Sequence, residues 1–191
     1  FEEGMEAIPS CIMASGSYTS YIDKIILPSQ LKKIGSSAFY NCGKITQMEV
    51  PKTITEIGGS AFENCTGLKS FRMNYNGTVE YKAEIGNAAF RGCTSLTDVS
   101  LSENVTSIGS MAFSGCTSLE TLNLPERVES LGRCLIGKTA ISSITIPKNV
   151  KYSTNVSSSY GVLVNVNTLK TVTFEEGMEA IPSCIMASGS Y

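Results

Sequence analysis

The sequence contains no histidine and no tryptophan among its 191 residues. Without histidine, the chain cannot build a Ser-His-Asp triad, a Cys–His dyad or a histidine-ligated zinc site, and no imidazole titrates near neutral pH. Neither sign of charge is in large excess, since the chain has 15 Lys and Arg residues and 17 Asp and Glu residues, for a net charge of −2. A chain without a basic excess has little affinity for phosphate backbones, so we expect no nucleic-acid partner.

Long apolar runs are missing as well. No window approaches the ~18 consecutive apolar residues of a transmembrane helix, so we expect no direct membrane insertion of this segment. Residues 1–4 lack the basic and apolar stretches of a signal peptide. With 42% hydrophobic and 17% charged residues, the composition is that of a folded chain.

One segment of the chain occurs twice. Residues 1–18 (FEEGMEAIPSCIMASGSY) recur letter for letter as residues 174–191. Such identity does not arise by chance, so we interpret residues 1–191 as a single domain that is a slice of a longer array with a super-repeat of about 173 residues. An engineered duplication is the alternative. In either case, the two copies should adopt the same local structure.

A shorter repeat runs through the whole chain. Four segments share Ile-Gly, Ala-Phe and Cys at fixed offsets, and they span residues 31–42, 54–65, 82–93 and 105–116. An apolar-x-x-apolar-x-apolar run occurs seven times, ending at residues 27, 50, 73, 101, 124, 146 and 174. The successive spacings are 23, 23, 28, 23, 22 and 28 residues, so two repeats carry an insertion of about five residues. This period and this apolar pattern are typical of leucine-rich repeats.

Each repeat predicts one coil of a solenoid. The last apolar positions of each run alternate with polar residues, which is the period of a strand, and a proline such as Pro51 then ends the strand. Gly35 and its equivalents allow a positive φ or a close backbone approach at a corner. The Ala-Phe-x-x-Cys piece is expected to form a short helical turn with these three side chains on one face.

Because one coil cannot bury its apolar edge alone, the coils must stack. The predicted fold is an α/β repeat rich in β structure. In detail, we expect a curved right-handed leucine-rich-repeat solenoid of about seven coils over residues 1–191. Each coil should carry one short parallel strand and a short helical turn.

The template Val-x-x-Ile-Gly-x-x-Ala-Phe-x-x-Cys-x-x-Leu-x-x-Val-x-Leu-Pro closely resembles the BspA-type leucine-rich repeat family of bacterial and protist surface proteins. Clear matches run from about Leu31 to Leu124. The resemblance implies a secreted or cell-surface protein that binds a protein or glycan on a host or neighbouring cell. Residues 131–136 lack the Ala-Phe pair and residues 150–166 lose Ile-Gly, so we expect these coils to be the least regular.

The cysteines occupy two repeat positions: Cys42, Cys65, Cys93 and Cys116 share one, while Cys11, Cys134 and Cys184 lie about one turn earlier. We interpret them as free thiols that pack as small apolar groups. Disulfides are a weaker alternative, because stacked side chains point in parallel and the count of seven is odd. Metal binding is weaker still, because the sequence has no C-x-x-C motif.

No catalytic motif is present. The sequence lacks G-x-S-x-G, the P-loop and G-x-G-x-x-G, and it has only two aspartates. The acidic pairs at residues 2–3 and 175–176 are interpreted as solvated turns. We therefore predict no enzymatic activity, no cofactor and no metal site.

The outward positions of the predicted strands are the candidate binding surface. They are polar and of mixed charge, and they would line one face of the solenoid. The candidate binding residues on this face are Lys69, Arg72, Thr97, Asp98, Ser100, Glu120 and Asn123. Tyr75 and Tyr81, which flank an Asn-Gly turn in the first insertion, complete the set. A Ser-rich loop between Tyr152 and Tyr160 marks the second insertion, and loops on rigid scaffolds often carry recognition.

The predicted function is a non-catalytic adhesion or partner-binding module at the cell surface. Two alternatives remain at this stage. The array could be a structural spacer that presents another domain, or the non-catalytic part of a larger surface enzyme. An ordinary solvated sheet face would also explain the polar strand positions.

Overall fold

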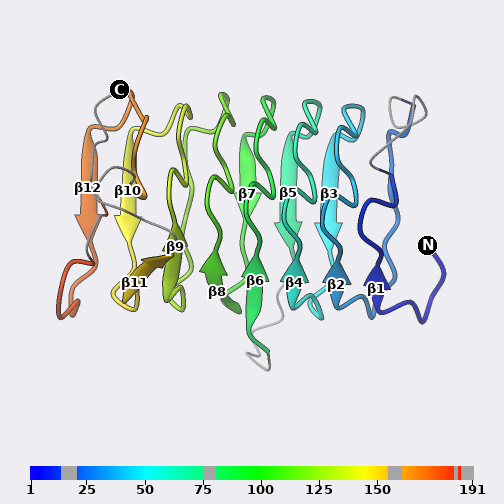
Figure 1. The fold of residues 1–191 in the computed structure, drawn as a ribbon, viewed down its shortest axis with the longest axis horizontal. Helices are drawn as coiled ribbons and strands as arrows, with labels where there is room; N and C mark the ends of the chain where they lie inside the picture. The colour runs from blue at the N-terminus through cyan, green and yellow to red at the C-terminus, as the bar shows by residue number, and fades with distance from the viewer. Residues whose placement is uncertain (14–20, 75–80, 155–160, 183–184, 186–191) are drawn as a thin grey trace.

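The computed structural model describes residues 1–13, 21–74, 81–154, 161–182 and 185. This part of the chain winds into a β-solenoid of about six turns, close to the seven expected. Two rows of short strands run along its long axis, and the strands of one row point opposite to those of the other (Figure 1). Residues 1–9 and residues 174–182 lie at opposite ends of the stack (Figure 1).

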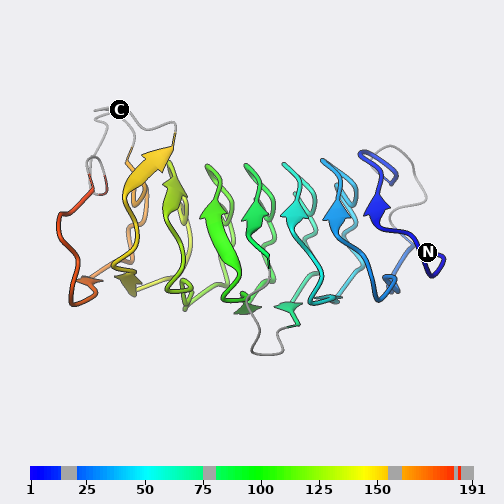
Figure 2. The same ribbon diagram turned by 90° about the horizontal axis from the view of Figure 1, so that it is seen from below.

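The first row is a seven-stranded parallel sheet. Its order is β1 (Ala7–Ile8), β2 (Lys33–Ile34), β4 (Glu56–Ile57), β6 (Ala83–Ile85), β8 (Val105–Ile108), β9 (Ser130–Gly132) and β11 (Tyr152–Thr154). Seen from below, these strands line one side of the solenoid (Figure 2).

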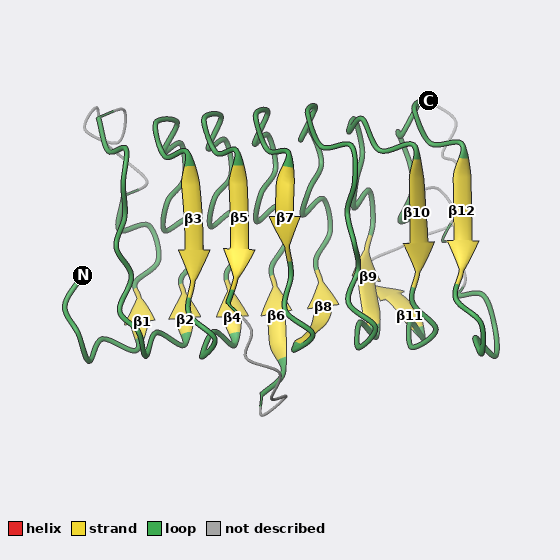
Figure 3. Cartoon of the chain, turned by 180° about the vertical axis from the view of Figure 1, so that it is seen from behind, coloured by secondary structure: helices red, strands yellow, loops and turns green. Residues whose placement is uncertain are grey.

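The second row is divided into two parallel sheets. Three strands form one sheet in the order β3 (Gln47–Val50), β5 (Ser70–Met73) and β7 (Asp98–Ser100). Two more form the other, β10 (Ser143–Ile146) and β12 (Thr171–Phe174). Residues 119–124 lie in the turn between these sheets without forming a strand, and residues 22–27 precede β3 in the same way (Figure 3).

The expectation of one strand per coil is therefore wrong, since most turns carry two. In the additional row an exposed residue alternates with a buried one, as at Lys33 and Ile34, which is the same period-two pattern in a shorter form. Conversely, two of the seven expected strands are absent among the described residues. Leu119 and Leu122 are buried all the same, so the apolar pattern predicts burial even where no ladder forms.

The expected helical turn at Ala-Phe-x-x-Cys is also wrong, and the described residues contain no helix (Figure 3). The second repeat shows the reason. Ser60 and Asn64 have φ values of 55° and 60°, so left-handed residues bracket the three between them. Phe62 N donates to Ala89 O of the next turn at 2.7 Å instead of to a residue four positions earlier. The backbone amide of Phe62 thus bonds to the neighbouring turn, whereas an α-helix would use a carbonyl of the same turn.

The apolar side chains of these turns stack along the interior. Phe62 and Phe90 are fully buried with ring centroids 5.3 Å apart and planes 5° apart. Phe90 and Phe113 repeat this geometry at 5.2 Å and 4°. Each aromatic residue therefore packs against its equivalent one turn away, and no single turn has a core of its own.

The cysteines three residues after each of the stacked phenylalanines form a second interior column. Cys65 Sγ donates to Phe39 O at 3.1 Å, and Cys93 and Cys116 repeat the contact with the preceding turn. Cys42, Cys65, Cys93 and Cys116 are buried free thiols, which confirms their interpretation as packing residues. For Cys11, which is exposed, the interpretation is wrong, and Cys134 is only partly buried. Cys184 lies outside the described residues. Burial raises the pKa of the Cys65 thiol from 9.0 to about 12, so it stays protonated at neutral pH.

The glycines that follow Ile34, Ile57, Ile85 and Ile108 lie where successive turns approach each other closely. A Cβ on Gly58 would stand 2.5 Å from Ser36 N, and one on Gly86 would stand 2.5 Å from Gly59 N. These glycines have no positive φ, so their backbone conformation does not require glycine. Glycine is required because a Cβ would overlap the neighbouring turn.

Replacing Gly58 by Ala should destabilise the fold by about 1–3 kcal/mol, because the new methyl group overlaps backbone atoms that cannot move independently. Gly59→Ala is the matched control, since a Cβ there would meet its nearest atom, Asn87 O, at 3.4 Å. Urea unfolding of both variants measures the difference. Equal midpoints for the two would show that the turns do not depend on this approach.

The buried thiols should make stability fall at alkaline pH. Cys65 keeps its proton in the folded state up to about pH 12, whereas the unfolded chain releases it above about 9, so unfolding is favoured as pH rises between these values. At ~1.4 kcal/mol per pKa unit, the loss from this thiol is about 2 kcal/mol between pH 9 and pH 11.

Cys65→Ala should remove that share of the pH dependence, as measured by urea unfolding across the alkaline range. Ile57→Val is the control, because it removes a buried methyl group without removing a titrating one. A Cys65→Ala profile parallel to that of the wild type would contradict a buried, protonated thiol.

Candidate binding face

The three-stranded sheet turns alternate side chains outward. Met48 and Phe71 point into the core and are at most 2% exposed, while Glu49 and Arg72 beside them are exposed. The parallel register places Glu49 opposite Arg72, and Arg72 opposite Ser100. The sequence therefore produces adjoining rows of polar side chains across neighbouring turns.

Seven of the predicted binding residues lie on this row of turns. All but Asp98, which is partly exposed, are exposed: Lys69, Arg72, Thr97, Ser100, Glu120 and Asn123. We call these seven residues the polar face. Glu120 and Asn123 come from the turn without a strand, so they extend the face beyond β7 toward β10.

The predicted tyrosines are not part of the polar face. Tyr81 is 50% exposed and lies two residues before β6, which belongs to the other row of strands. Tyr75 and the Ser-rich segment 155–160 fall outside the described residues. The structure thus separates the strand-face candidates from Tyr81.

An ion pair joins two strands of the polar face. Arg72 Nη2 lies 2.5 Å from Asp98 Oδ2, and both side chains remain about half exposed, at 54% and 48%. A pair with this much solvent contributes little to folding, about 0–1 kcal/mol. Its groups remain accessible, so both can be redirected to a charged or hydrogen-bonding ligand.

Sequence reasoning missed the part of the face that β3 contributes. Gln47 and Glu49 are exposed and continue the rows formed by Ser70 and Arg72. The alternation of Gln47, Met48, Glu49 and Val50 carries the same signal as the later strands. Beyond β3, a groove of about 800 Å³ separates this strand from residues 23–27.

The chemistry of the polar face is that of hydrogen bonding and charge. Among the described residues, no group of three or more His, Cys, Asp or Glu side chains is placed to hold a metal ion. The buried cysteines point to the interior, and burial raises the pKa of Cys42 to about 11, so their thiols are not nucleophiles at neutral pH. No helix in the described part of the chain is long and apolar enough to cross a membrane.

Two solved structures share the fold of this chain. A leucine-rich cell surface protein from Faecalibacterium prausnitzii superposes with a TM-score of 0.60 at 20% identity, over 89% of this chain and 51% of that one. A leucine-rich repeat protein from T. pallidum gives a TM-score of 0.53 at 18% identity, over 72% and 71%. The chain thus spans about half the length of the F. prausnitzii protein.

No significant match was found among curated proteins. The sequence model of the BspA type leucine rich repeat region matches residues 12–82 and 83–188, with six copies. These matches cover most of the chain and contain the Ile-Gly, Ala-Phe and Cys positions that stack in the structure. The chain therefore belongs to the BspA-type leucine-rich repeat family.

Proposed function

We propose that this chain is a non-catalytic binding module of a secreted or cell-surface protein and that the polar face contacts a protein or glycan on a host or neighbouring cell. The observation that carries the proposal is the regular placement of exposed polar groups on a rigid parallel sheet. Arg72, Asp98 and Ser100 come from adjacent strands and are held in register by backbone hydrogen bonds.

A rigid face of this kind suits extended ligands. The backbone of the strand residues is fixed because alternate residues are buried, so a ligand does not have to order this backbone first. Hydroxyl, guanidinium and carboxylate groups alternate along it, and these groups match the hydroxyls of glycans and the polar surface of proteins. The family membership and the F. prausnitzii surface protein of like fold support a surface location.

If the chain is only a structural spacer, the identity of the polar-face residues should not matter. A module that only holds another domain away from the cell needs the stacked core but not the identity of its outward side chains. The structure offers a matched comparison, because Lys33 and Glu56 form an equivalent ion pair on the other row of strands, with Nζ 3.1 Å from Oε2.

Binding should weaken when the polar face is truncated. We expect the 191-residue chain to select ligands from an array of glycans and extracellular-matrix proteins. A Lys69→Ala, Arg72→Ala and Asp98→Ala variant should weaken these interactions about tenfold or more, equivalent to ~1.4 kcal/mol or more. Surface plasmon resonance on the selected ligands measures the change.

The control variant carries Lys33→Ala, Glu56→Ala and Glu84→Ala on the other row of strands. It removes a comparable ion pair and a neighbouring charge, so it should retain wild-type affinity. Equal binding by both variants and the wild type would argue for the spacer.

A further inference from the structure

The second row of strands is interrupted inside the stack. Residues 119–124 lie between β7 and β10, yet they form no ladder with either strand. In a regular turn the amide at the start of the strand position reaches the turn before it, as when Thr97 N donates to Lys69 O at 3.0 Å. Glu120 is the equivalent of Thr97, and its N–H donates to no residue in the described part of the chain.

The rest of this segment is unpaired in the same way. From Glu120 to Leu124, no backbone N–H or C=O group hydrogen bonds to another described residue. Glu120, Thr121 and Asn123 are exposed, so water can satisfy these groups. The side chain of Leu122 is nevertheless buried. The segment therefore packs against the core but is not joined to its neighbours by a ladder.

The turn that leads into β10 is one residue short. Thr139 takes the place of Cys116 in this turn, since the amide of each donates to the residue three positions earlier. Two residues separate Cys116 from the buried Leu119, whereas one residue separates Thr139 from the buried Ile141. The chain thus reaches β10 one residue early relative to the turn before it, which works against a regular ladder between them.

Two interior columns end at the same place. The stacked aromatic rings stop at Phe113, and Ile136 takes the equivalent position in the next turn. Cys116 Sγ donates to Phe90 O of the preceding turn at 3.2 Å, whereas Thr139 Oγ1 donates to Ile136 O of its own turn at 2.8 Å. Contacts that join the earlier turns through the interior are therefore missing at this boundary.

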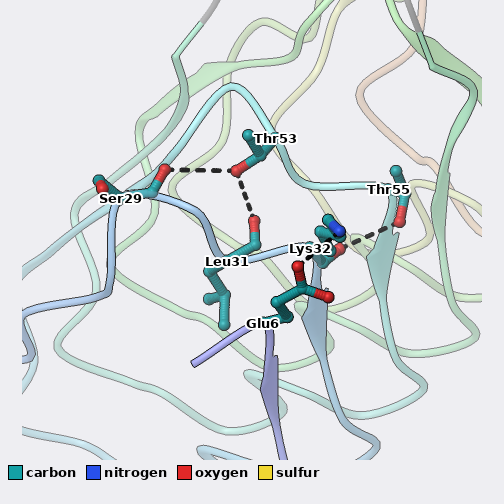
Figure 4. A network of polar contacts seen from close by, with 6 residues as sticks. All are labelled: Glu6, Ser29, Leu31, Lys32, Thr53 and Thr55. Carbon is teal, nitrogen blue, oxygen red and sulfur yellow. Dashed lines mark hydrogen bonds and ion pairs between the residues drawn. The ribbon is translucent and has the colours of Figure 1, made fainter. Parts of the chain in front are cut away.

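Side chains add further ties in the regular part of the stack. Thr53 Oγ1 donates to Leu31 O at 2.7 Å, and Thr55 Oγ1 donates to Lys32 O at 3.1 Å, so each threonine binds the preceding turn (Figure 4). The turn that leads into β10 has Arg127 at the position of Thr53. No hydrogen bond from Arg127 to a described residue replaces the tie that Thr53 makes.

The first row of strands is continuous at the same level. β8 pairs with β9, and a Cβ on Gly132 would overlap Ser110 N of the preceding turn. The corner is also joined, because Phe113 N donates to Leu135 O at 2.9 Å. One side of the solenoid is therefore held together at this boundary, while the opposite side is open.

We propose that residues 119–124 form a hinge between two rigid blocks of the solenoid. One block consists of the turns that carry β3, β5 and β7, and the other consists of the turns that carry β10 and β12. The blocks bend about the continuous first row, so β7 and β10 move relative to each other. Hinges of this kind use a few residues that lack the fixed hydrogen bonds of the elements they connect.

The hinge crosses the polar face. Arg72 and Asp98 belong to the first block, whereas Glu120 and Asn123 lie in the hinge itself. Bending therefore changes the curvature of the polar face and the spacing between its two halves. This would let the face adapt to ligands of different shape, but the movement itself does not depend on the proposed function.

Spin labels can measure the movement without a ligand. The background variant carries Cys11→Ser, Cys134→Ser and Cys184→Ser, which removes the cysteines outside the interior column. The four column cysteines are buried, so they should not react with the label. Circular dichroism confirms that each labelled variant is folded.

Two label pairs give a matched comparison. Glu49→Cys with Ser100→Cys spans two turns within one sheet, and Ser100→Cys with Thr145→Cys spans two turns across the hinge. At ~4.8 Å between neighbouring strands, the first pair should give a narrow distribution around a Cα separation of about 10 Å. We expect the pair across the hinge to give a distribution at least about twice as wide, measured by electron paramagnetic resonance.

A second set of pairs guards against the effect of a single label. Gln47→Cys with Asp98→Cys, and Asp98→Cys with Ser143→Cys, repeat the comparison two positions earlier in the strands. Equal widths within the sheet and across the hinge, in both sets, would overturn the proposal. A longer but equally narrow distance across the hinge would overturn it too, because the boundary would then be open but rigid. Neither result involves a ligand, so the outcome is distinguishable from the test of binding.

Discussion

The structure depends on the close approach of successive turns along one column of glycines. At Gly58 and Gly86 the backbones of neighbouring turns come so near that no Cβ fits between them. This distance allows the amides of one turn to reach the carbonyls of the next, as from Phe62 to Ala89, and it brings the phenylalanine rings into stacking contact. The interior is therefore a set of columns, and the stability of each turn comes from its neighbours.

The same constraint decides which surfaces are open for binding. A turn contacts only its neighbours, so its outward side chains stay uncovered along the whole stack, and Arg72 and Asp98 remain accessible although they are held in register. A polar face along the stack therefore follows from this mode of packing.

The repeat in the sequence was sufficient to predict the burial of Phe62 and Cys65 and the strands β3 and β5, because period-two alternation and fixed spacing follow directly from stacking. It did not predict the left-handed corners. Asn64 and Gly92 are residue types that adopt positive φ readily, but Ser60 and Ala88 are not, and there the contact with the next turn overrides local preference. For the polar face, the spacing of the repeats was sufficient to predict that β5 and β7 lie side by side in register. It could not predict that Tyr81 lies apart from this face, because Tyr81 precedes a strand of the other row, which the sequence did not predict.

The neighbouring turns hold the non-strand corners as firmly as they hold the strands. Amide hydrogen exchange at Phe62, which donates to the next turn, and at Gly58, which donates to Ile34 O, tests it most directly. We expect both amides to exchange only through global unfolding, with the same opening free energy. Exchange at Phe62 that is orders of magnitude faster than at Gly58 would contradict it, because the corner would then open without the rest of the solenoid.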